Sequence, residues 1–243
     1  NTDVQGTVHA NTITNLDVDG DAYYKTISNS NVTGASYPNS TDPGPVELPL
    51  SDAQIDQWKA DGAAGGTITG DATYDGVSAT LGPKKITGNL TIANGATVTI
   101  NGTLYVQGNL TIENNAVVSL APGYGSGSGI IVADGKITVS NNVVFNGSGT
   151  VGSYVLMLTT STSLDSANPA MDLNNNSDNS AFYAGDGVVT IANNAVVKEV
   201  TAFKIDLANN ASVQYESGLS NVNFSSGPGG SWVLRSGSTR EIR

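Results

Sequence analysis

Residues 172–178 (DLNNNSD) place oxygen-bearing side chains at every second position, which is how a calcium-binding loop begins. The oxygen donors would be Asp172, Asn174, Asn176 and Asp178. A complete EF-hand also needs a bidentate Glu at its twelfth position, where this sequence has a Tyr. The segment therefore predicts either a Ca²⁺ loop with those four residues as ligands or an Asx-rich turn.

A second segment, 17–21 (DVDGD), repeats this spacing with Asp17, Asp19 and Asp21. Its twelfth position is Ser28, so it is not an EF-hand either. The alternative interpretation is a strand whose polar residues face outward.

Acid–base catalysis on a polysaccharide would require paired carboxylates, or carboxylates that hold Ca²⁺ beside a basic residue. Within the repeats, only Asp134 and Asp186 share a position, each directly before a Gly, and we expect about two coil spacings between them. That pattern indicates turns. His9 is the only histidine, and no G-x-S-x-G motif occurs. The sequence therefore predicts a protein that is not an enzyme. The carboxylates considered are Glu113, Asp134, Asp165, Asp186, Glu199, Asp206 and Glu216.

Exposed aromatic rings can stack on sugars, but the aromatic residues do not follow one position of the repeat. We therefore expect most of them to pack in the core or in loops. The candidates for sugar stacking are Tyr23, Tyr24, Trp58, Tyr105, Tyr124, Tyr154, Tyr183, Tyr215 and Trp232.

Five similar segments must position any such site. Each has alternating apolar residues on both sides of an Asn-Asn, Asn-Gly or comparable pair, which predicts a strand, a sharp corner and a second strand. Asn and Gly enter the left-handed backbone region at the lowest cost. The segments are 88–100, 108–120, 135–147, 187–199 and 203–215.

An Asn-Gly pair between strands also suits a β-hairpin, but apolar residues of one kind recur at the same repeat positions. Like residues then stack over like residues, as parallel coils require. The long gap between segments 135–147 and 187–199 leaves room for a degenerate copy of the repeat around residues 152–160. The repeated asparagines would form a ladder of side-chain amides, which we interpret as structural. The sequence thus predicts an all-β chain folded as a single-stranded, right-handed parallel β-helix, the hand following from the general preference of parallel crossovers.

One helix is expected at residues 51–63, with Ser51 as N-cap, Gln54 completing a capping box, and Leu50 and Ile55 forming a hydrophobic staple. We expect this short capping helix to cover an open end or flank of the solenoid. The whole chain, 1–243, is interpreted as one domain. Its parts are the first coil or coils (1–36), a Pro-rich strap (37–50), the capping helix (51–63), the main solenoid (64–230) and a C-terminal tail (231–243).

The composition of the chain excludes some classes of binding partner. Charged residues make up 13% of the chain, the formal net charge is −11, and there are no cysteines. A nucleic-acid partner is not expected, because phosphate binding needs clustered Lys and Arg. No segment has the length of a membrane span, so membrane attachment would require an N-terminal anchor that these residues do not include.

Five segments together suggest a family: VHANTI…GDAYY (8–24), 49–66, 81–92, 124–142 and 216–232. They resemble the extracellular β-helix region of bacterial pilus-assembly proteins of the PilX-like, type IV pilin-like class. The resemblance extends over nearly the whole chain. It implies a pilus-associated or cell-surface role without catalysis, on the outside of a bacterial cell.

We therefore expect a non-enzymatic, extracellular module for adhesion or pilus assembly. Its partners would be other pilus or cell-surface proteins or a surface polysaccharide, contacted through loops 37–45, 121–129 and 163–182. Cofactors are not expected apart from the possible Ca²⁺. One alternative is a β-helix protein that binds or degrades polysaccharide. Another is a structural protein that stacks into filaments, although a covered end would prevent stacking.

Overall fold

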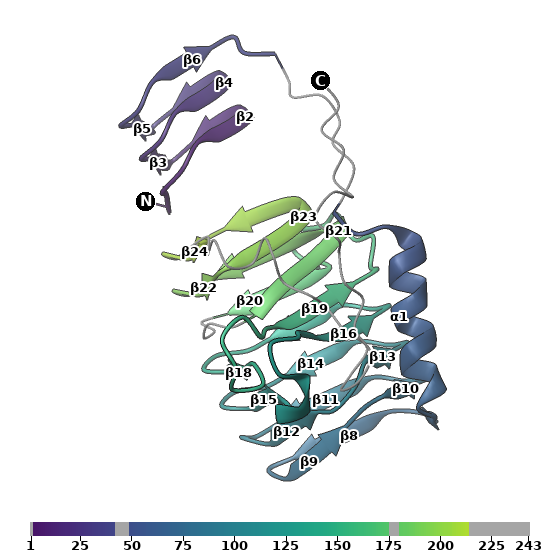
Figure 1. Ribbon diagram of the computed structural model, residues 1–243. Coiled ribbons are helices and arrows are strands. Elements are labelled where there is room, and N and C mark those ends of the chain that lie inside the picture. Colours follow the sequence, from purple (N-terminus) through teal and green to yellow (C-terminus); the bar gives the residue numbers. More distant parts are fainter. Residues whose placement is uncertain (1, 42–48, 175–179, 214–243) are drawn as a thin grey trace.

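The computed structural model describes residues 2–41, 49–174 and 180–213. The chain forms a solenoid-like stack of coils with one α-helix along its side (Figure 1). Every strand pair between described residues is parallel, as the repeats predicted. These parallel pairs include strands from the first, β1, to the last, β24.

The main stack has three faces, so each coil contains three short strands where the sequence had predicted two. The additional face comes from segments between the repeats that the alignment left out. Its strands are β7 (Thr67–Ile68), β10 (Lys84–Ile86), β13 (Leu104–Val106), β16 (Gly129–Ala133) and β19 (Val155–Thr159).

The other two faces contain the predicted repeat strands. The second face consists of β8 (Ala72–Asp75), β11 (Leu90–Ala93), β14 (Leu110–Ile112), β17 (Ile137–Val139) and β20 (Met171–Asn174). The third consists of β9 (Ser78–Leu81), β12 (Thr97–Ile100), β15 (Val117–Leu120) and β18 (Val144–Asn146), and β22 (Val196–Val197) pairs with β24 (Ser212–Val213). Long strands β21 (Ser180–Ala192) and β23 (Glu199–Leu207) bend through the first two faces and join them into one sheet of twelve strands.

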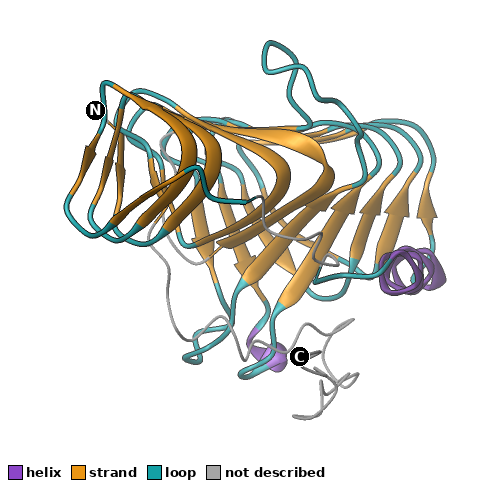
Figure 2. Cartoon of the chain, turned by 90° about the horizontal axis from the view of Figure 1, so that it is seen from above, coloured by secondary structure: helices purple, strands orange, loops and turns teal. Residues whose placement is uncertain are grey.

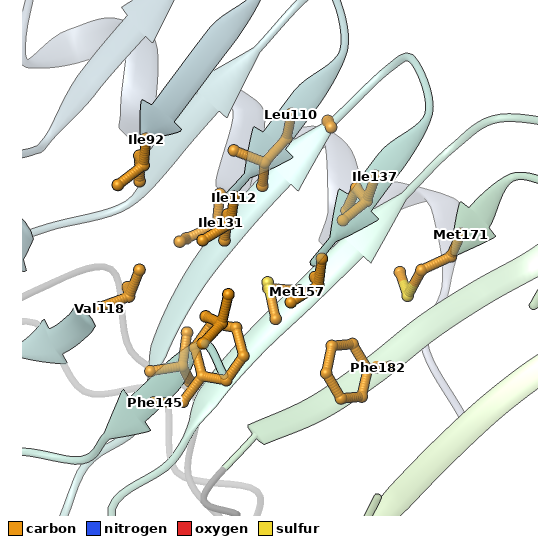
Figure 3. Close-up of a cluster of buried hydrophobic side chains, with 14 of the residues drawn as sticks. Ile92, Leu110, Ile112, Val118, Ile131, Ile137, Phe145, Met157, Met171 and Phe182 are labelled. Carbon is orange, nitrogen blue, oxygen red and sulfur yellow. The ribbon is translucent and has the colours of Figure 1, made fainter. Parts of the chain in front are cut away.

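The core is a set of apolar columns that run along the stack. Leu90 pairs with Leu110, Leu110 with Ile137, and Ile137 with Met171, in the register that the repeats predicted. All four side chains are fully buried, and Leu110, Ile137 and Met171 point into the space between the faces (Figure 3). The coil expected near residues 152–160 is present as β19, which lies between β16 and β21.

Asparagines at the corners have the left-handed backbone conformation that their type predicted, with φ of 48° at Asn94, 62° at Asn115 and 58° at Asn142. Part of the amide ladder is formed: Asn209 donates its side-chain amide to Asn193 at 3.1 Å, and Asn193 donates to Asn174 at 2.8 Å. The corner asparagines therefore hold successive coils in register.

Residues 2–38 form three narrower coils of 14 residues, since Thr2 pairs with Leu16. Their strands are β1 (Thr2–Val4), β3 (Leu16–Val18) and β5 (Asn31–Val32) in one sheet, and β2 (Val8–Thr14), β4 (Ala22–Ser28) and β6 (Ser36–Pro38) in another. β1 contacts β24, so the first coils lie beyond the last coil of the main stack (Figure 1).

The helix α1 (Asp52–Ala64) lies within one residue of its predicted bounds, and the amide N of Gln54 donates to the Ser51 side chain at 3.3 Å. It packs along β10, β13 and β16, and its Trp58 is 1% exposed. Thirteen helical residues rise about 20 Å, roughly the height of four coils. The helix therefore covers a flank, not an end: Figure 1 shows it running beside the coils, and Figure 2 shows it end-on, seen from above, beside the strands. Of the two positions expected for this helix, an open end or a flank, the structure has the flank, because Ile55 and Trp58 pack on buried apolar residues of β16, β19 and β21.

Several predicted boundaries lie outside the described residues. These are half of the Pro-rich strap 37–50, the part of the main solenoid after residue 213, and the tail 231–243. None of the helices that the structure describes is long and apolar enough to cross a membrane.

Candidate functional site

Three aromatic rings form a ladder on the outside of the first coils. The ring of Tyr23 lies between the rings of His9 and Tyr37, with centroid distances of 4.2 Å and 4.4 Å. The interplanar angles are 2° and 9°, so the rings stack face to face. The side chain of Tyr37 is 42% exposed. The ladder contributes nothing to the core, and it is therefore a candidate binding surface.

Register and strand alternation place these rings. His9 pairs with Tyr23, and Tyr23 pairs with Tyr37, along β2, β4 and β6. The neighbours of His9 in β2, Val8 and Ala10, face the small core of these coils. Because side chains alternate across a strand, the three rings must face outward.

Hydroxyl groups line the other half of the same strands. The Oγ1 atoms of Thr12 and Thr26 lie 3.0 Å apart, and Thr14 Oγ1 lies 3.2 Å from Ser28 Oγ. All four side chains are exposed. This surface of ring edges and hydroxyls can contact a ligand and form hydrogen bonds with it.

The electrostatics of the ladder favour the neutral form of Tyr23. Burial against its neighbours raises the pKa of Tyr23, and the Tyr37 ring and the Asp21 carboxylate raise it further. Tyr23 is therefore a neutral phenol at physiological pH. It can donate and accept hydrogen bonds, but it is not activated as a nucleophile.

The prediction that the aromatic candidates follow no repeat position was wrong for Tyr23, which stacks in register with His9 and with Tyr37, a residue outside that set. The first coils repeat every 14 residues, and this period is shorter than that of the main stack, which was used for the comparison. A search for 14-residue spacing would have found the rings, the paired hydroxyls, and Asn15 with Asn29.

A second polar cluster joins the helix to the sheet. Lys59 Nζ on α1 lies 2.7 Å from Asp134 Oδ1, in the turn after β16. The hydroxyl of Tyr105 donates to Asp134 Oδ2 at 2.6 Å, and that of Thr160 donates to Oδ1 at 3.0 Å. The Asp134 carboxylate thus accepts hydrogen bonds from three different elements.

The cluster holds its carboxyl group ionised. Burial raises the pKa of Asp134, but hydrogen bonds from Lys59, Tyr105 and Thr160 and the Lys59 charge outweigh this effect, so the net pKa lies below the ordinary value. Burial and the bond to Asp134 raise the pKa of Tyr105 to about 12. An acid that protonates a leaving group needs a raised pKa, so Asp134 is suited to a structural role.

A hollow of about 510 Å³ adjoins this cluster between the first turns of α1 and the bend of β21. Asp186, which shares a repeat position with Asp134 in the sequence, lines it together with Asp52 and Asp56. Asp134 and Asp186 therefore lie near the same flank of the stack. The alignment of repeats could not show that α1 covers this flank.

The predicted calcium segment is only partly described. Asp172 and Asn174 lie in strand β20, and Asn176 and Asp178 lie outside the described residues. Lys136 Nζ is 3.7 Å from Asp172 Oδ2, and the Asn174 amide donates to Asp172 Oδ1 at 3.2 Å. Within the described chain, no group of three or more His, Cys, Asp or Glu side chains could hold a metal ion.

The second acidic segment forms strand and corner. Asp17 lies in β3, and Asp21 Oδ1 accepts a hydrogen bond from the amide N of Ala35 at 2.8 Å. The Asp21 carboxylate therefore joins two successive coils.

The three predicted contact loops differ in structure. Loop 121–129 contains a short 3₁₀ helix, Pro122–Tyr124, and buries Tyr124 against the core. Lys204 Nζ donates to Ser166 Oγ at 2.8 Å and so ties loop 163–182 to β23. Residues 42–45 of the first loop and 175–179 of the third lie outside the described residues.

Comparison with known proteins identified no relatives: no family model, no curated protein and no solved structure matches this chain.

Proposed function

We propose that this chain is a non-enzymatic module of the bacterial cell surface or of a pilus, a right-handed parallel β-helix that binds a partner for adhesion or pilus assembly. The right hand follows from the general preference of parallel crossover connections. The pilus association is supported by the resemblance to PilX-like proteins described above. The partner is a surface polysaccharide or another cell-surface protein.

The ring ladder of His9, Tyr23 and Tyr37 is the observation that supports binding most directly. Tyrosine rings offer a large contact area and lose little conformational freedom on binding, and they are enriched at interfaces. The neighbouring pairs Thr12–Thr26 and Thr14–Ser28 supply hydrogen-bonding groups without charge. This combination suits a polysaccharide, whose rings have apolar faces and hydroxyl edges.

A glycan and polysaccharide array tests this proposal, run with Ca²⁺ and again with a chelator. We expect binding without turnover, and loss of binding in the double variant Y23A/Y37A. Phe203→Ala is the matched control, because it removes a 67% exposed ring from β23 without touching the ladder.

Binding that survives Y23A/Y37A would contradict the assignment of the ladder. Release of shortened sugar chains would instead favour the polysaccharide-degrading alternative. Loss of binding in the presence of the chelator would instead indicate that Ca²⁺ is required, with Asp172 and Asn174 as candidate ligands.

A further inference from the structure

The first coil of the main stack leaves three strand edges free. Within the described chain, β7 pairs only with β10, β8 only with β11, and β9 only with β12. These strands form the end of the stack opposite the first coils in Figure 1. A Cβ added at Gly70, which precedes β8, would have no atom within 4 Å.

Free edges of this kind are templates for pairing with another chain. The floor of this coil is partly apolar, because Ile68, Ala72 and Tyr74 pack against the core but are only half-buried. The opposite end of the stack is a poor complement, since its coils have 14 residues, whereas Ala72 pairs with Leu90 18 positions later. The same end of a second copy matches in size.

A carboxylate occupies the corner before β8, although the ladder at this corner does not need a charge. Asp71 Oδ1 accepts the backbone N–H of Asn89 at 2.7 Å. One coil further on, Asn89 Oδ1 accepts the N–H of Asn109 at 2.8 Å, and Asn109 Oδ1 accepts that of Lys136 at 2.9 Å. An amide therefore performs the same role inside the stack. The charge of Asp71 has no function in the ladder.

The other end of β8 also carries a carboxylate. Asp75 Oδ1 accepts a hydrogen bond from the Asn94 side-chain amide at 2.8 Å, and the residue in register with Asp75 in the next coil is Ala93. Carboxylates thus flank the free edge on both sides.

We propose that Asp71 and Asp75 prevent the open end of the stack from pairing with the same end of a second copy. A two-fold contact would make the two β8 strands antiparallel. When such a pair is centred on Thr73, Asp71 of each copy lies opposite Asp75 of the other copy. Like charges directly opposite each other destabilise a strand pair. The device keeps two copies from dimerising through this end.

The test compares the self-association of D71N/D75N with that of the unmodified chain by sedimentation velocity. Asparagine keeps the acceptor oxygens, so the ladder should persist. We expect the association constant to rise by at least about tenfold, corresponding to two like-charge contacts relieved. The control D52N/D56N removes two exposed carboxylates from α1, and we expect it to remain as monomeric as the unmodified chain.

Two further measurements locate the contact. The chain has no cysteine, so Thr73→Cys allows a short bismaleimide to cross-link only copies that meet at β8. We expect rapid cross-linking with D71N/D75N and little without it. In addition, D71K/D75K should form a mixed dimer with the unmodified chain, and salt should weaken that dimer.

A monomeric D71N/D75N variant with native circular dichroism would overturn the proposal. Equal association of the D52N/D56N control would also overturn it, because net charge alone would then explain the effect. If D71N/D75N does not fold, the mixture with D71K/D75K decides: the absence of a mixed dimer would overturn the proposal.

Discussion

Lys59 on the helix forms an ion pair with Asp134 in a turn of the stack, with 2.7 Å between Nζ and Oδ1. Both side chains are partly buried, at 21% and 30% exposure. Lys59→Met keeps much of the side-chain volume but removes the charge. We expect it to lower the free energy of unfolding by about 1–2 kcal/mol, because the Asp134 carboxylate loses a charged donor. Urea denaturation measures this change.

A double-mutant cycle with Asp134→Asn separates the pair from its surroundings. The effects of the two substitutions should be less than additive. Additive effects would contradict direct coupling. Because the pKa of Asp134 is lowered in the folded chain, its contribution is present above the unfolded pKa and is lost as the pH falls through the folded value. The Asp134→Asn variant should therefore lose less stability in acid than the unmodified chain.

The raised pKa of the Tyr105 hydroxyl predicts how the stability of the folded chain changes at alkaline pH. Its pKa is raised from 10.0 to about 12, so the folded chain holds this proton more firmly than the unfolded chain. The resulting stability is complete below pH 10 and is lost as the pH rises through 12. Tyr105→Phe should be less stable at neutral pH and should show a smaller alkaline loss. Unfolding curves at a series of pH values test this. An identical alkaline loss in both chains would contradict the assignment.

Gly62 lies where the helix approaches the sheet closely, and its lack of a side chain permits this contact. A Cβ at this position would lie 3.0 Å from Tyr105 Cβ and 3.2 Å from the Tyr105 backbone N. Alanine is normally favoured over glycine inside a helix. Here we expect Gly62→Ala to destabilise the chain by about 1–3 kcal/mol, because the helix must move away from β13.

Ala60→Gly is the matched control, at an exposed position of the same helix. It should cost about 1 kcal/mol through helix propensity alone. Thermal unfolding measures both variants. A Gly62→Ala variant more stable than the unmodified chain would show that the contact is loose.

Local patterns predicted the parts of the fold that local physics determines. Alternation and the recurrence of Leu90, Leu110 and Ile137 predicted parallel stacking, because one register buries all of them. The N-cap of Ser51 predicted the helix start, since capping depends on a few neighbouring residues.

Local sequence patterns could not predict the contacts between the helix and the flank of the stack. Lys59 meets Asp134 only because the helix runs back along the stack, and that path depends on the fit of Trp58 and Ile55 to several strands at once. The ring ladder was missed for another reason. His9 and Tyr23 follow a 14-residue period, which differs from the period of the repeats in the main stack.

The glycines at the corner before the second face form a column that permits the coils to approach. A Cβ at Gly108 would lie 2.5 Å from Asn89 Oδ1 and 2.7 Å from the carbonyl oxygen of Gly88. Neither atom can withdraw easily, since Asn89 Oδ1 accepts the N–H of Asn109 and the Gly88 carbonyl belongs to the backbone. Gly108→Ala should therefore destabilise the chain by about 2–4 kcal/mol, because it separates two coils and weakens the hydrogen-bonded ladder between them.

Gly6→Ala is the matched control for Gly108→Ala. A Cβ at Gly6 would have no atom within 4 Å, so we expect a change within about 0.5 kcal/mol. Urea denaturation of both variants, with hydrogen exchange at the Asn109 amide, distinguishes a local from a global effect. Faster exchange of this amide in Gly108→Ala should accompany the lower midpoint, because the bond from Asn109 to Asn89 lies at the site of the clash. An unchanged midpoint would mean that the coils can separate there without cost, and the column would then have no role in stacking.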